Sequence, residues 1–184
     1  DQRGYNLSDK PDGIAAYTLD ELGADVIRLI DSAGQQTAFV IGHDWGAAVA
    51  WWVAAKYPTR LARMVIINVP HGAVLTKHLR RNFAQMRKSW YMFFFQLPFF
   101  PELLLSQNGH ERALRLLKSS SLSGSFSSQD LSQYRQAWSQ PRAWTGMINW
   151  YRALRIRSAR QAPRRISVPT LMIWGANDIA LGQE

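Results

Sequence analysis

The chain has 184 residues, of which 47% are hydrophobic and 12% aromatic, as in an ordinary folded domain rather than a disordered segment. It contains no cysteine, which excludes disulfides and thiolate metal sites. The net charge of +9 is uneven, because residues 1–70 carry six Lys/Arg against eight Asp/Glu and residues 71–184 carry 16 against five. The cations, among them Arg112, Arg115, Lys118 and Arg152, recur at helical spacing without a nucleic-acid-binding motif, so we interpret them as solvated helix faces and expect no nucleic-acid partner.

The sequence has no segment typical of a signal peptide or a membrane span. Its first residues, D-Q-R-G-Y, do not form a charged start followed by an apolar centre. The most apolar stretch, Ser89 to Leu105, is interrupted by Gln96, Pro98 and Pro101 and is shorter than the ~20 residues that a spanning helix needs. We therefore expect a soluble, cytoplasmic protein.

The first 70 residues alternate between helical and strand patterns. From Leu19 to about Gly34 the apolar residues follow helical spacing, and Thr37–Ile41 is a short apolar run of the kind found in buried strands. Gly42–Gly46 then predicts a turn, Ala47–Tyr57 a helix and Met64–Ile67 a second strand. Helices and strands that alternate in this way are typical of a parallel sheet covered by helices.

The pattern changes after Pro70. Residues 71–160 are mostly helical, aromatic-rich and basic, with a serine-rich loop at Ser119–Ser128, and Val168–Trp174 returns to the strand pattern. We therefore predict an α/β fold with three strands, core segments at residues 1–70 and 161–184, and a helical insertion at residues 71–160.

The stretch G-H-D-W-G, Gly42 to Gly46, joins the first predicted strand to the helix that follows it. It matches the nucleophile elbow, a strained turn that lifts one side chain above the edge of a sheet and needs small residues on both sides. The lifted side chain is the carboxylate of Asp44. The next amide, on Trp45, lies at a helix N-terminus and is expected to form half of an oxyanion hole.

A carboxylate at this position restricts the chemistry. Serine, the usual residue at such a turn, attacks acyl carbons, whereas a carboxylate displaces a leaving group from saturated carbon. Asp44 would then carry an alkyl ester that water hydrolyses, and the leaving group would be an epoxide oxygen or a halide. The alternative is that Asp44 only caps the following helix.

With this elbow and three further motifs, the chain resembles the epoxide hydrolases of the α/β-hydrolase superfamily. The motifs are D-Q-R-G-Y-N-L-S-D-K-P at Asp1–Pro11, S-W-Y-M-F-F-F-Q-L-P at Ser89–Pro98 and N-W-Y-R at Asn149–Arg152. Asn6 stands where the family often has glycine, and asparagine also tolerates left-handed backbone dihedrals.

The resemblance implies a partial α/β-hydrolase fold with the helical insertion as its cap. It also implies that Tyr91 and Tyr151 are the two cap tyrosines whose hydroxyls bind and protonate the epoxide oxygen. As a bare pattern, aromatic residues at such positions are more often core than catalytic.

Asp178, four residues after the strand that ends at Trp174, matches the family's acid, which orients a histidine that activates water. The four histidines of the chain fit that base poorly. The resemblance places the histidine after Glu184 and the H-G-x-P turn, with the second oxyanion amide, before Asp1. We therefore expect an internal piece of a longer enzyme that is inactive by itself.

The implied activity is hydrolysis of a small apolar epoxide to a vicinal diol, with water as the second reactant and with no metal or organic cofactor. The nearest alternative is a haloalkane or haloacid dehalogenase, in which the indole N–H of Trp45 would hold the halide. A binding protein that uses the same fold without turnover is a further alternative.

Overall fold

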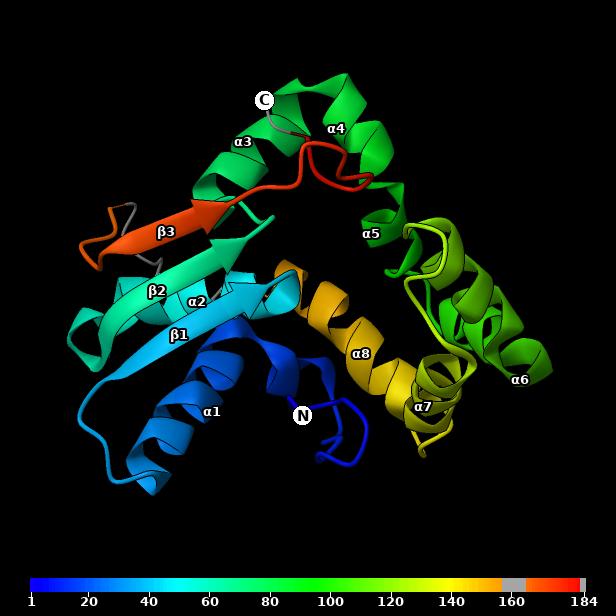
Figure 1. The fold of residues 1–184 in the computed structure, drawn as a ribbon, viewed down its shortest axis with the longest axis horizontal. Helices are drawn as coiled ribbons and strands as arrows, with labels where there is room; N and C mark the ends of the chain where they lie inside the picture. The colour runs from blue at the N-terminus through cyan, green and yellow to red at the C-terminus, as the bar shows by residue number, and fades with distance from the viewer. Residues whose placement is uncertain (157–164, 183–184) are drawn as a thin grey trace. The chain divides into compact units, whose positions relative to one another are not determined.

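The computed structural model describes residues 1–156 and 165–182. They divide into two compact units, each described by itself below (Figure 1). The sheet unit comprises Thr18–Trp90 and the described residues from 165 onward, and the helical unit comprises Asp1–Tyr17 and Tyr91–Ile156. Within the described ranges, no helix is both long and apolar enough to cross a membrane.

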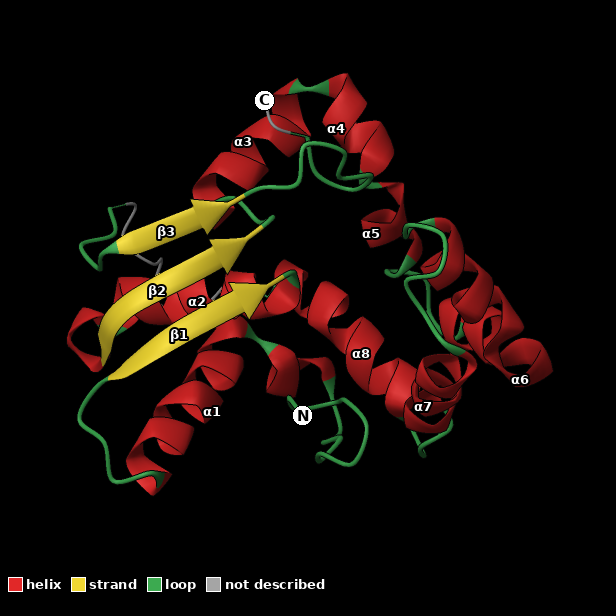
Figure 2. Ribbon diagram, viewed as in Figure 1, coloured by secondary structure: helices red, strands yellow, loops and turns green. Residues whose placement is uncertain are grey.

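Three parallel strands form the sheet unit's centre in the order β1-β2-β3 (Figure 2). They are β1 (Ala38–His43), β2 (Leu61–Ile67) and β3 (Thr170–Ile173). The predicted parallel α/β sheet is therefore confirmed. β1 runs two residues beyond the predicted Ile41, because Gly42 and His43 still pair with β2.

Helix α2 (Trp45–Lys56) packs directly on β1 and β2, and helix α1 (Leu19–Ser32) packs on α2 (Figure 1). Seven of the twelve residues of α2 are buried, and all of them except Trp51 are alanine or valine. Trp52 and Val53 of α2 lie against Gly23 of α1. A short 3-10 turn, η2 (Pro58–Arg60), follows α2. After β2, α3 (Gly72–Arg81) and α4 (Phe83–Lys88) form a helical hairpin.

The helical unit contains α5 (Trp90–Phe94) from Tyr91 onward, α6 (Phe100–Ser119), α7 (Ser128–Trp138) and α8 (Ala143–Arg152), with the 3-10 turns η1 (Ile14–Tyr17) and η3 (Ala153–Arg155). The described part of the predicted insertion is helical, as expected. The serine-rich loop ends where Ser127 and Asp130 form a capping box at the start of α7. α6 changes direction at residues 107–110, whose backbone dihedrals are not helical.

The N-terminal segment packs on α8. The Trp150 indole N–H donates to the carbonyl of Arg3 at 3.0 Å. The backbones of Gly4 and Gly146 lie so close that a Cβ on Gly146 would be 2.8 Å from the Gly4 oxygen. Asn6 has φ 44°, in the left-handed region predicted for it.

The boundaries between core and insertion that we predicted at residues 70 and 160 stay a prediction.

Candidate active site

Asp44 lies in the turn between β1 and α2 and has φ 50° and ψ −124°, a strained conformation for a residue with a side chain. A Cβ on Gly42 would be 2.5 Å from the carbonyl oxygen of Gly46 and 2.7 Å from the Cα of Ala47. Real Cβ atoms do not approach backbone atoms so closely, so Gly42 has to be glycine. The tight turn inferred from G-H-D-W-G is therefore present.

The side chain of Asp44 is exposed and accepts no hydrogen bond from the first amides of α2. Only its backbone carbonyl takes part in the helix, accepting from Ala47 N at 3.0 Å and Ala48 N at 3.2 Å. The alternative of a helix-capping aspartate is therefore wrong. Trp45 is the first residue of α2, so its amide lies at the N-terminus of that helix.

The carboxylate of Asp178 is held by donors from two directions. Oδ1 accepts from Ala180 N and Leu181 N, both at 2.8 Å, and Oδ2 accepts from Asn68 Nδ2. Partial burial alone would raise the pKa of this carboxyl. The hydrogen bonds and the charge of Lys88 outweigh that effect, and the pKa of Asp178 lies below its ordinary value. The group is ionised at neutral pH and fixed in direction.

Asn68 joins the ends of β2 and β3, a role that the sequence did not reveal. Its backbone N–H donates to Ile173 O at 3.0 Å, and its Oδ1 accepts from Gly175 N at 2.8 Å while Nδ2 reaches Asp178. Its φ of 61° explains why asparagine suits this position. The sequence signal that could have indicated this role is the position of Asn68, a polar residue that tolerates left-handed dihedrals, directly after a strand.

Asp44, Asn68 and Asp178 all follow the carboxyl ends of neighbouring parallel strands. His43 pairs with Ile67, and Ile67 pairs with Ile173, so the three strands end at the same level. This edge is where open α/β sheets bind ligands. Two strand spacings separate β1 from β3, about 10 Å, which leaves room for an imidazole between the two acids.

None of the four histidines, all within the described residues, hydrogen-bonds to Asp178. His43 ends β1 with its side chain exposed. His71 caps α3, accepting from Ala73 N at 3.3 Å, and burial lowers its pKa. His110 is buried in the helical unit, where its ring contacts tryptophans.

The helical unit brings Tyr91 of α5 and Tyr151 of α8 together. Their ring centroids are 5.8 Å apart at an interplanar angle of 81°. Phe95 packs against both rings, at 6.0 Å from Tyr91 and 4.8 Å from Tyr151. The two predicted tyrosines, 60 residues apart in the chain, therefore belong to one aromatic cluster.

An ion pair fixes α8 to the segment that follows α5. The guanidinium of Arg152 binds both carboxylate oxygens of Glu102 at 2.5 and 3.0 Å and donates to the carbonyls of Phe95 at 3.1 Å and Leu97 at 2.6 Å. The side chains are only 12% and 18% exposed. Our interpretation of Arg152 as a solvated cation was therefore wrong. The sequence did not show the pairing, because the partners of Arg152 are about 50 residues away in the chain.

Gln96 makes a second connection between the tyrosine helices. Its Nε2 donates to Met92 O and to Tyr151 O, each at 3.0 Å. Met92 follows Tyr91 in α5, so one amide joins the backbones beside both tyrosines. The sequence showed Gln96 only as an interruption of an apolar stretch.

The strained elbow, the in-register parallel strands and the acid after β3 are features of the α/β-hydrolase fold. Residues 1–183 match the family described as alpha/beta hydrolase fold, and the chain belongs to it. The resemblance to epoxide hydrolases is also confirmed, by the relatives described next.

The chain is 45% identical over 184 residues to the AB hydrolase superfamily protein YfhM of Bacillus subtilis, with 100% of this chain and 64% of that protein covered. It is 38% identical over 184 residues to human epoxide hydrolase 4, with coverages of 97% and 50%. A crystal structure of Bacillus megaterium epoxide hydrolase in complex with an inhibitor superposes with a TM-score of 0.88 at 28% identity. That match covers 100% of this chain and 68% of the crystallised one. The chain thus spans less than two thirds of each of the two curated relatives.

Proposed function

We propose that the complete protein hydrolyses an epoxide to a vicinal diol through an alkyl ester on Asp44. The observation that carries the proposal is a carboxylate at the elbow that is exposed, strained and not used as a helix cap. The contact between Tyr91 and Tyr151 and the relatives whose names state epoxide hydrolase activity support it.

In the first step, one oxygen of Asp44 attacks a carbon of the strained ring, and the bond between that carbon and the ring oxygen breaks. The electron pair goes to the ring oxygen, which takes a proton from the hydroxyl of Tyr91 or Tyr151. Phe95 contacts both tyrosines, and Phe94 packs against Phe95 and Phe100 with ring centroids 5.7 and 5.9 Å apart. This aromatic cluster around the tyrosines favours an apolar substrate.

In the second step, water attacks the carbonyl carbon of the ester, and the negative charge develops on the oxygen of Asp44 near the amide of Trp45. Asp178 is proposed to orient the histidine that takes the proton from this water. The tetrahedral intermediate collapses, the bond between the carbonyl carbon and the alkyl oxygen breaks, and the diol leaves after protonation.

The two steps fix the fate of each oxygen atom, and this gives the decisive experiment. The diol of the first turnover keeps an oxygen from Asp44, while the oxygen of water enters the carboxylate. A single turnover of the complete protein in H₂¹⁸O should therefore label the peptide that contains Asp44 and leave the diol unlabelled. A labelled diol in the first turnover would show direct attack of water and refute the ester.

Two sets of variants test the roles of the side chains. Asp44→Ala should abolish diol formation, while the protein stays folded because the side chain holds no helix amide. Replacing both Tyr91 and Tyr151 with phenylalanine should slow ring opening by at least about 10²- to 10⁴-fold, the usual size of one general-acid contribution. An unchanged rate in the double phenylalanine variant would remove the tyrosines from the mechanism.

The dehalogenase alternative is not favoured, because the relatives whose names state an activity are epoxide hydrolases and halide release has no use for a tyrosine pair. The substrate class and water are the partners that we propose. The cytoplasmic location stays a prediction.

A further inference from the structure

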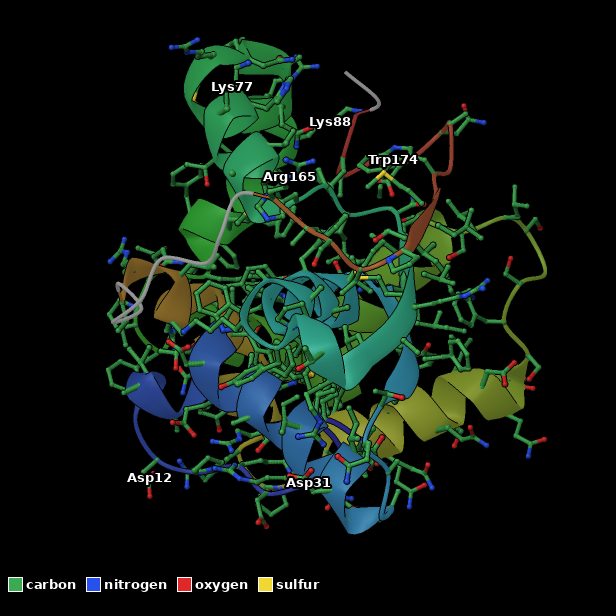
Figure 3. The ribbon with its side chains drawn as sticks, turned by 90° about the vertical axis from the view of Figure 1, so that its left-hand side faces the viewer. Asp12, Asp31, Lys77, Lys88, Arg165 and Trp174 are labelled. Atoms are coloured by element: carbon green, nitrogen blue, oxygen red, sulfur yellow. The ribbon has the colours of Figure 1, made fainter. Side chains whose placement is uncertain are left out.

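The hairpin of α3 and α4 is a strongly basic part of the sheet unit. The chain has no Asp or Glu between Asp44 and Glu102. The hairpin nevertheless carries the exposed cations Lys77, Arg81, Arg87 and Lys88, two of which Figure 3 labels. No acid of the hairpin itself neutralises them.

One face of α3 combines these cations with an apolar side chain. Val74, Lys77 and Arg81 follow the i, i+3, i+7 spacing that places residues on one side of a helix, and all three are exposed. Leu75 and Leu79 lie on the other side and are half-buried. The exposed stripe is therefore basic with an apolar component.

One side of α4 is held by hydrogen bonds to the C-terminal segment, and the other side is exposed. Gln85 is buried, and its amide donates to Ala180 O at 2.8 Å and accepts from Gly182 N at 3.0 Å. At 100° per residue, Phe83 and Arg87 then point away from that buried contact. Phe83 is 75% exposed and lines a shallow pocket with Lys77 and Arg81.

We propose that this surface, formed by Val74, Lys77, Arg81, Phe83 and Arg87, binds the surface of an anionic phospholipid bilayer. Cations interleaved with exposed apolar side chains suit the boundary between headgroups and acyl chains, where lipid phosphates take the cations and the outer acyl region takes Phe83 and Val74. A nucleic acid would satisfy the cations but would leave Val74 exposed. The surface is independent of the proposed reaction.

The test is sedimentation of the complete protein with vesicles of phosphatidylcholine, with and without phosphatidylserine. Binding should require phosphatidylserine and weaken with salt. The variant Lys77→Gln/Arg81→Gln should bind about 25-fold more weakly, about fivefold for each lost cation. The matched control is Arg112→Gln/Arg115→Gln, which removes two exposed cations of α6 and changes the net charge equally. It should bind as the unchanged protein does.

A second pair of variants tests the apolar part. Phe83→Ser should weaken binding, whereas Leu122→Ser, at a residue that is 86% exposed in the serine-rich loop, should not. Circular dichroism should show the same helix content in all variants. Equal binding to both kinds of vesicle, an equal loss in the control pair, or binding of an oligonucleotide without binding of vesicles would each overturn the proposal.

Discussion

Gly42→Ala should destabilise the sheet unit strongly, because the added methyl group has no space. Its Cβ would lie 2.5 Å from Gly46 O and 2.7 Å from both the N and the Cα of Ala47. All these atoms belong to the backbone of the turn and the first turn of α2, so no flexible side chain can move aside. The φ of Gly42 is not in the left-handed region, and the penalty is therefore steric.

Overpacking of a well-packed site typically costs 1–3 kcal/mol, and contact with backbone places Gly42→Ala at the upper end, about 3 kcal/mol. Urea unfolding of the complete protein measures this loss. With an m-value of about 2 kcal/mol/M, the midpoint should fall by about 1.5 M. Diol formation should fall as well, since the position of Asp44 depends on the same turn.

Gly72→Ala is the matched control. A Cβ on Gly72 meets nothing within 4 Å, and its φ is not in the left-handed region. The methyl group restricts only the unfolded chain there, so stability should stay the same or rise by up to about 1 kcal/mol. If the free energies of unfolding of Gly42→Ala and Gly72→Ala differ by less than about 0.5 kcal/mol, the steric explanation for Gly42 is wrong.

Three further predictions concern the supporting contacts. Arg152→Met should cost about 3 kcal/mol in urea unfolding, because Glu102 loses its partner in a largely buried pair, whereas Arg115→Met, which breaks an exposed 3.6 Å pair, should cost less than about 0.5 kcal/mol. Gln96→Met should cost about 1 kcal/mol and lower kcat, since two partly buried carbonyls lose their donor. An unchanged kcat would limit the role of Gln96 to stability. The pKa of Asp178 is lowered in the folded protein, so its contribution to stability is present above the ordinary value of 3.8 and is lost as the pH falls through the lower folded value. Asp178→Asn should remove that part of the pH dependence, and an unchanged acid unfolding profile would contradict it.

The sequence predicts the sheet unit well, because its signals are local. A strand buried by helices is an unbroken apolar run, and the elbow is marked by glycines that only a tight turn requires. The boundaries were less accurate. β2 begins at Leu61 rather than Met64, and β3 covers Thr170–Ile173 rather than the predicted Val168–Trp174, because pairing with neighbouring strands decides where a strand begins and ends.

The supporting residues could not be predicted in the same way. Arg152 has the spacing of a surface cation, and its burial becomes visible only when Glu102 and the carbonyls after α5 are placed around it. Asn68 likewise has the appearance of a loop residue until Gly175 and Asp178 surround its amide. In both cases the chemistry of one side chain depends on partners about 50 to 110 residues away.

The two units therefore hold their candidate residues by different means. Substitutions in the two units should for this reason impair different parts of the reaction. Asp44 is placed by a short stretch of backbone, so a change that disturbs the turn should remove ester formation itself. Tyr91 and Tyr151 are placed by Arg152 and Gln96, whose contacts join α5 to α8. Loss of either contact should leave attack by Asp44 possible but deprive the opening ring of its proton. The rate of ring opening should then fall more for an epoxide whose ring oxygen is a poor leaving group than for an activated epoxide whose oxygen leaves easily. Equal falls in rate for both substrates would contradict this division of roles.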